Sequence, residues 1–123
     1  MKRIISIIIL LLAVITLSAQ DITGTWSGDL SYTDGMGQAT KLTVKFNISA
    51  TENGYTSTLD SPDQDVYGRA VDTTFFKESK LTVKAAEYNN LEYVGTLIDE
   101  TTINGKLTQA GMPFELNLKK EPE

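Results

Sequence analysis

The chain has 123 residues and a formal net charge of −5, and it contains neither histidine nor cysteine. Without cysteine there are no disulfides, thiolate nucleophiles or cysteine-ligated metals, and without histidine the usual general base and the commonest zinc ligand are missing. Its 16 acidic residues outnumber 11 basic ones, which argues against binding to nucleic acid or to anionic lipid surfaces, because both demand clustered Lys or Arg.

The first 19 residues resemble a secretory signal peptide. Lys2 and Arg3 are basic, residues 4–17 are almost uninterruptedly apolar, and Ser18 and Ala19 are the small residues that a signal peptidase requires. The apolar run is shorter than the roughly 20 residues that span a bilayer, and no cysteine is present for lipid attachment. We expect a helical signal peptide over residues 1–19, cleavage after Ala19, no stable membrane anchor afterwards, and a periplasmic or secreted protein.

From Gly24 onward, apolar residues recur at every second position, which is the period of a strand with one buried face. The alternation is clearest over residues 42–48, and residues 81–85 and 114–118 repeat it. Short turn signals separate these runs. They lie at residues 34–37, 52–54, 77–79, 89–90, 99–100 and 110–111.

The regular spacing of the turns predicts the fold. Turn signals every ten residues or so suit an antiparallel meander, in which consecutive strands pair through hairpins. We predict one all-β domain over residues 20–118, a small lipocalin-like or calycin-like meander β-barrel of about eight or nine strands. A polar tail is expected over residues 119–123.

Three glycines, Gly28, Gly95 and Gly105, fall on the inward-facing parity of their strands. We interpret them as positions where a tightly coiled strand bends and a side chain would clash. The alternative is that the missing side chains leave room for a ligand.

The interior of a barrel of this size either holds one small ligand or is filled by side chains. If it holds a ligand, six inward positions are predicted to line the site. They are Trp26, Leu42, Phe46, Tyr55, Tyr93 and Leu107. For Trp26 we favour a structural role over a ligand contact, namely that of a plug that closes one end of the barrel.

Two further polar features are candidate ligand contacts. Residues 60–65 carry three carboxylates but lack the spacing of a calcium-binding loop, so we interpret them as a solvated turn and predict no metal site. Arg69 is the only arginine after residue 19. It can bind a ligand carboxylate, but ion pairing with a nearby aspartate is favoured. The candidate partners are Asp63, Asp65 and Asp72.

Three blocks of sequence carry a resemblance to a known domain: residues 21–28 (DITGTWSG), 54–64 (GYTSTLDSPDQ) and 114–120 (FELNLKK). Together they resemble the N-terminal β-barrel that precedes the catalytic domain in exported bacterial α/β-hydrolase-fold proteins of the serine aminopeptidase type. In that family the nucleophile, acid and histidine belong to the later domain, which we expect this chain to lack. The resemblance implies a barrel with no catalytic residues of its own.

We therefore expect a non-enzymatic exported module that needs no cofactor and binds a small apolar or carbohydrate ligand or a partner protein. One alternative is the accessory domain of a secreted esterase or peptidase whose catalytic domain is encoded separately or truncated here, in which case the downstream reading frame should carry a Gly-x-Ser-x-Gly motif. Another alternative is a structural envelope protein, and a closed and empty barrel would be evidence for it.

Overall fold

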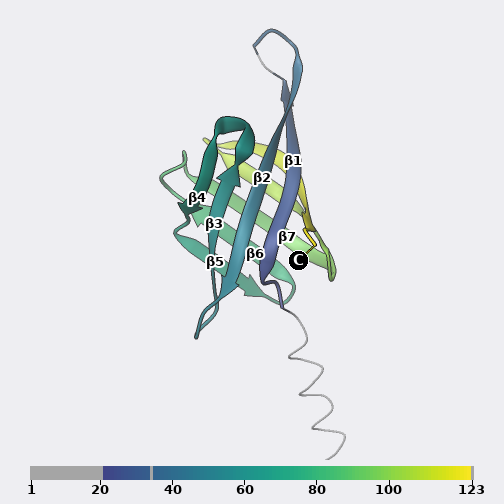
Figure 1. The fold of residues 1–123 in the computed structure, drawn as a ribbon. Coiled ribbons are helices and arrows are strands. Elements are labelled where there is room, and N and C mark those ends of the chain that lie inside the picture. Colours follow the sequence, from purple (N-terminus) through teal and green to yellow (C-terminus); the bar gives the residue numbers. More distant parts are fainter. Residues whose placement is uncertain (1–20, 34, 123) are drawn as a thin grey trace, which may run out of the picture.

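The computed structural model describes residues 21–33 and 35–122, and the predicted signal peptide lies outside them. Nine strands form one antiparallel sheet, which confirms the predicted all-β class and the number of strands (Figure 1). Across the described residues, no helix has the length and apolar character needed to cross a membrane. The elements are β1 (Gly24–Thr33), β2 (Ala39–Ala50), β3 (Tyr55–Ser61), the 3₁₀ helix η1 (Pro62–Gln64), β4 (Val66–Ala70), β5 (Thr73–Lys77), β6 (Lys80–Ala85), β7 (Leu91–Asp99), β8 (Thr102–Gln109) and β9 (Met112–Lys120).

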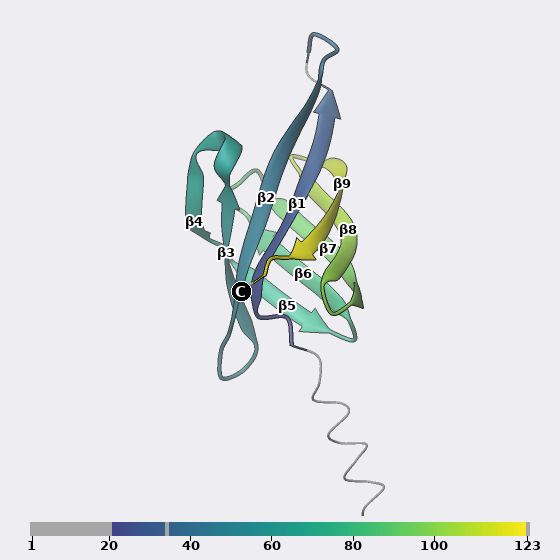
Figure 2. The same ribbon diagram turned by 45° about the vertical axis from the view of Figure 1, so that its right-hand side comes forward.

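The strand order is β4-β3-β2-β1-β9-β8-β7-β6-β5. Consecutive strands pair within two meanders, β1 to β4 and β5 to β9, as the turn spacing predicted. The meanders join where β1 pairs with β9, at Trp26 with Lys120 and at Ser27 with Lys119. Figure 2 shows β9 running beside β1. The one consecutive pair that does not form a hairpin is β4 and β5, which are the two ends of the sheet.

The sheet curls until β5, at one end, approaches β3, the neighbour of the other end, and side chains rather than a backbone ladder bridge these two strands. The hydroxyl groups of Ser57 on β3 and Thr74 on β5 share a hydrogen bond of 2.6 Å. The rings of Tyr55 and Phe76 meet edge to face, with their centroids 6.3 Å apart. The molecule is therefore an open barrel with a side-chain seam between β3 and β5.

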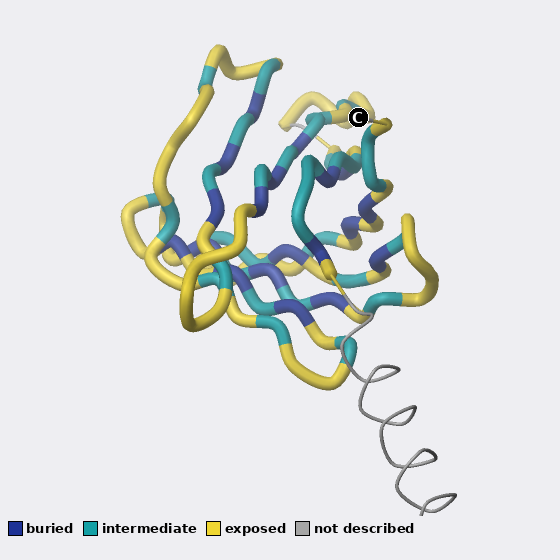
Figure 3. Tube along the Cα trace, turned by 60° about the horizontal axis from the view of Figure 1, so that its bottom comes forward, coloured by how far each residue is buried: buried dark blue, intermediate teal, exposed yellow. Residues whose placement is uncertain are grey.

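Alternating side chains of the strands fill the inside of the curled sheet, and buried positions alternate with more exposed ones in Figure 3. Trp26 is 0% exposed, and its indole N–H donates to the carbonyl oxygen of Ile22 at 2.9 Å. This bond ties the segment before β1 to the core. Burial of Trp26 near the start of β1 supports its interpretation as the plug of one barrel end.

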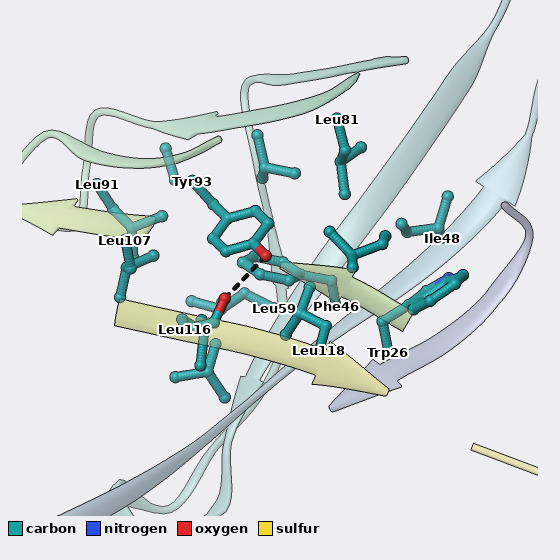
Figure 4. Close-up of a cluster of buried hydrophobic side chains, with 14 of the residues drawn as sticks. Trp26, Phe46, Ile48, Leu59, Leu81, Leu91, Tyr93, Leu107, Leu116 and Leu118 are labelled. Atoms are coloured by element: carbon teal, nitrogen blue, oxygen red, sulfur yellow. Dashed lines mark hydrogen bonds between the residues drawn. The ribbon is translucent and has the colours of Figure 1, made fainter. Parts of the chain in front are cut away.

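Tyr93 explains two of the three inward glycines. A Cβ atom on Gly95 would lie 2.6 Å from the Tyr93 hydroxyl, and one on Gly105 would lie 2.8 Å from it. The hydroxyl donates to the carbonyl oxygen of Leu116 at 2.9 Å (Figure 4), and burial raises the pKa of Tyr93, which keeps this donor protonated. The space that these glycines leave is filled by Tyr93, so the alternative of room for a ligand is wrong there.

Gly28 meets the neighbouring backbone instead. A Cβ atom at this position would run into the carbonyl oxygen of Asn117 and would lie 3.1 Å from Leu116 Cδ1. Close approach of β1 and β9 is therefore the reason for glycine at this position. This agrees with the prediction that a side chain would clash at this inward-facing position.

Candidate functional site

A cavity of about 210 Å³ lies at the end of the barrel away from Trp26. Its walls come from β1 to β4 and η1 on one side, and from β8, the start of β7 and the turn before it on the other. The lining residues are Leu30, Leu42, Val44, Leu59, Ser61, Gln64, Val66, Arg69, Tyr88, Leu91, Leu107 and Gln109.

The deep part of this cavity is apolar because the lining residues occupy inward positions of paired strands. Leu30 on β1 stands opposite Leu42 on β2, and Leu107 is 2% exposed. Phe46 follows Val44 at the next inward position of β2, and its ring packs against Tyr93 with centroids 5.5 Å apart. This aromatic pair lies outside the lining and fills the barrel beyond the cavity.

The structure separates the six residues that the sequence predicted for the site. Leu42 and Leu107 line the cavity. Tyr55 stands at the seam, beside a different surface hollow that Phe76 also lines. The remaining three are fully buried in the core outside the lining: Trp26, Phe46 and Tyr93.

Polar side chains gather at the mouth. Ser61 Oγ donates to Gln64 Oε1 at 2.8 Å, an arrangement that leaves the N–H groups of the Gln64 amide for another acceptor. Gln109 Nε2 donates to the carbonyl oxygen of Tyr88 at 3.0 Å. The cavity thus combines an apolar interior with a rim of hydrogen-bonding groups, the usual make-up of a small-molecule site.

A β-bulge in β4 brings Arg69 to this rim. Val66 stands opposite Ser61 and Arg69 opposite Leu59, so three steps along β4 match two along β3. Directly opposite residues share a face of the sheet, and Leu59 and Ser61 are buried on the inner one. The bulge therefore places both Val66 and Arg69 on the cavity face, which a regular strand cannot do.

Gly68 allows this bulge. Its φ is +64°, a left-handed backbone conformation that glycine adopts without steric cost. Its N–H donates to Asp60 Oδ1 at 2.7 Å, so the carboxylate of β3 fixes the extra residue of β4. Period-two reasoning missed Arg69 as an inner-face residue; the glycine following Tyr67 was the only local signal in the sequence.

The predicted ion pair between Arg69 and an aspartate is absent from the described residues, whose ion pairs are Lys45–Glu121 and Lys84–Glu92. Two of the expected partners accept backbone hydrogen bonds elsewhere. Asp63 Oδ2 accepts from the N–H of Thr43 at 2.7 Å, and Asp72 Oδ2 accepts from the N–H of Ala86 at 2.7 Å. The expected ion pair is wrong, and two of its three candidate carboxylates bind a backbone N–H of β2 and the N–H of the residue after β6 instead.

The acidic segment over residues 60–65 spreads its carboxylates in different directions. The Asp60 carboxylate accepts hydrogen bonds from Gly68 and Asn47, whereas the Asp63 carboxylate accepts one from Thr43 on β2. Within residues 21–33 and 35–122, no three acidic side chains converge in a group that could hold a metal ion.

The fold and the cavity define a class of small all-β protein with an open, curled antiparallel sheet. Comparison of the chain with protein-family models, curated proteins and solved structures gives no match. The resemblance to the accessory barrel of exported hydrolases stays a prediction.

Proposed function

We propose that this protein is an exported, non-enzymatic binding module whose cavity takes one small apolar molecule or short alkyl chain. The observation that carries the proposal is the cavity at one end of the barrel, which has an apolar interior and a rim of polar groups. The signal-like residues 1–19 support export.

The size and chemistry of the cavity favour an alkyl chain over a sugar. A water molecule takes about 30 Å³ in the liquid, so about 210 Å³ accommodates a ligand of roughly seven heavy atoms. The inner walls of Leu30, Leu59 and Leu107 offer no hydrogen-bonding side-chain group. A sugar would leave its hydroxyl groups unpaired there, and each unpaired group would cost about 1–3 kcal/mol.

A homologous series of 1-alkanols, from butanol to dodecanol, tests this proposal by isothermal titration calorimetry on the purified protein. Each buried methylene contributes about 0.8 kcal/mol, so the dissociation constant should fall about fourfold per carbon. The gain should stop near heptanol, when about seven carbons fill the cavity and the hydroxyl group reaches the rim. Absence of saturable binding by every alkanol would refute the proposal, and so would a gain that continues undiminished to dodecanol.

A pair of variants on β2 localises the binding. Leu42→Trp puts a bulky ring into the cavity mouth and should abolish octanol binding. Lys41→Trp adds the same ring at the adjacent, exposed position and should leave the affinity unchanged. Thermal unfolding of both variants establishes that they are folded. Equal octanol affinities for the two folded variants would contradict this location.

A further inference from the structure

We propose that the cavity selects amphipathic molecules that end in a carboxylate, and that Arg69 binds this group at the mouth. The inference rests on the proposed function and adds to it the chemical class of the ligand. Three features of the described residues carry it: the face on which Arg69 stands, the absence of a competing carboxylate, and the neighbouring hydrogen-bond donor.

The first feature is the bulge in β4. An arginine on a sheet normally stands on the solvent face, where its guanidinium stays hydrated. Here the extra residue at Tyr67–Gly68 places Arg69 opposite Leu59, on the face that lines the cavity. Bulges that redirect a side chain are frequent beside functional sites, and this one is held by the bond from Gly68 N–H to Asp60.

The second feature is that no carboxylate of the described residues occupies the Arg69 guanidinium. Among the described residues, no carboxylate forms an ion pair with Arg69. Asp60, Asp63 and Asp72 instead accept hydrogen bonds from backbone N–H groups, and Asp65 lies beyond ion-pair distance of Arg69. The planar set of donors on Arg69 is therefore available to an incoming carboxylate, whose two oxygens it can bind side by side.

The third feature is Gln64 on η1. Its amide oxygen accepts the hydrogen bond from Ser61, so the amide nitrogen is the part that remains to donate to a ligand. Arg69 is the only charged residue of the lining. One positive charge balances a carboxylate monoanion better than a phosphate dianion, and on this ground we assign the carboxylate.

Calorimetry with octanoate, 1-octanol and octylamine tests the proposal at neutral pH and low salt, because the three have eight carbon atoms each and differ in end group. Octanoate should bind about fivefold to tenfold more tightly than octanol, since Arg69 is exposed and its ion pair is partly screened. Octylamine should bind more weakly than octanol. About 0.5 M NaCl should reduce the preference for octanoate.

Substitutions of Arg69 separate this inference from the proposed function. Arg69→Gln should abolish the preference for octanoate over octanol when both are measured on the same variant, and Arg69→Lys should retain part of the preference. Lys106→Gln removes the same charge from an exposed position next to Leu107 on β8 and should keep the full preference.

The outcomes are distinct. Equal binding of octanol and octanoate by the unmodified protein would overturn the carboxylate proposal and leave the apolar cavity standing, as would a preference that survives in folded Arg69→Gln. If neither ligand binds, both proposals fail.

Discussion

Replacing Trp26 with alanine is expected to lower the free energy of unfolding by about 3–5 kcal/mol, as for other fully buried aromatic residues. Trp26 is the largest of the fully buried side chains. Its removal leaves a void at the closed end of the barrel and deprives the Ile22 carbonyl oxygen of its donor. Because small domains are stable by only about 5–15 kcal/mol, this single change would remove a large part of the total.

Urea denaturation followed by far-ultraviolet circular dichroism measures this loss without relying on Trp26 fluorescence. Tyr67→Ala is the matched control, since Tyr67 is 61% exposed and its truncation should change stability by no more than about 0.5 kcal/mol. A loss below about 1 kcal/mol for Trp26→Ala would show that Trp26 does not plug the barrel.

Gly105→Ala is expected to destabilise the fold by about 3 kcal/mol, the upper end of the usual cost of overpacking. The added methyl group would run into the Val94 carbonyl oxygen and would lie 2.5 Å from the Gly95 Cα. Both are backbone atoms of β7, the strand that pairs with β8 at this point. A rotamer change cannot relieve such contacts, so the two strands would have to separate.

Gly54→Ala is the matched control for this substitution. Gly54 lies in the turn between β2 and β3, and an added Cβ there would meet no atom within 4 Å. Alanine at such a position is neutral or stabilising by about 0.4–1 kcal/mol, because it restricts the unfolded chain. The midpoint of thermal unfolding should therefore fall for Gly105→Ala and should stay the same or rise for Gly54→Ala. If Gly105→Ala matched the unmodified protein, the close approach of β7 and β8 would be refuted.

Local sequence signals predicted the strands well. Several turns occur where the sequence placed them, and Asn89 and Asn90 adopt the left-handed backbone that asparagine tolerates (φ of 57° and 55°). The strand order was less accessible. The pairing of β1 with β9 and the seam between β3 and β5 join segments far apart in the chain, which periodicity does not report.

The candidate site was predicted only in part. Alternation assigns a side chain to the inner face but gives no position along the barrel axis, so Phe46 and Tyr93 were grouped with Leu42 and Leu107 although they fill the barrel beyond the cavity. Arg69 was named from the sequence only as a less favoured ligand contact, and its place on the inner face was missed. Its face depends on one extra residue in β4, and a period-two pattern assumes that none is present.

The strand order also bears on when the cavity comes into existence. Both meanders are continuous in sequence, and β1 to β4 supply one wall while β7 and β8 supply the other. A chain that emerges through a translocation channel from its N-terminus can complete the first meander early, but its second wall is still to come, and β9 must arrive last to join β1. If the chain is exported unfolded from its N-terminus, as we propose, the cavity is complete only after crossing, and a ligand can bind only then.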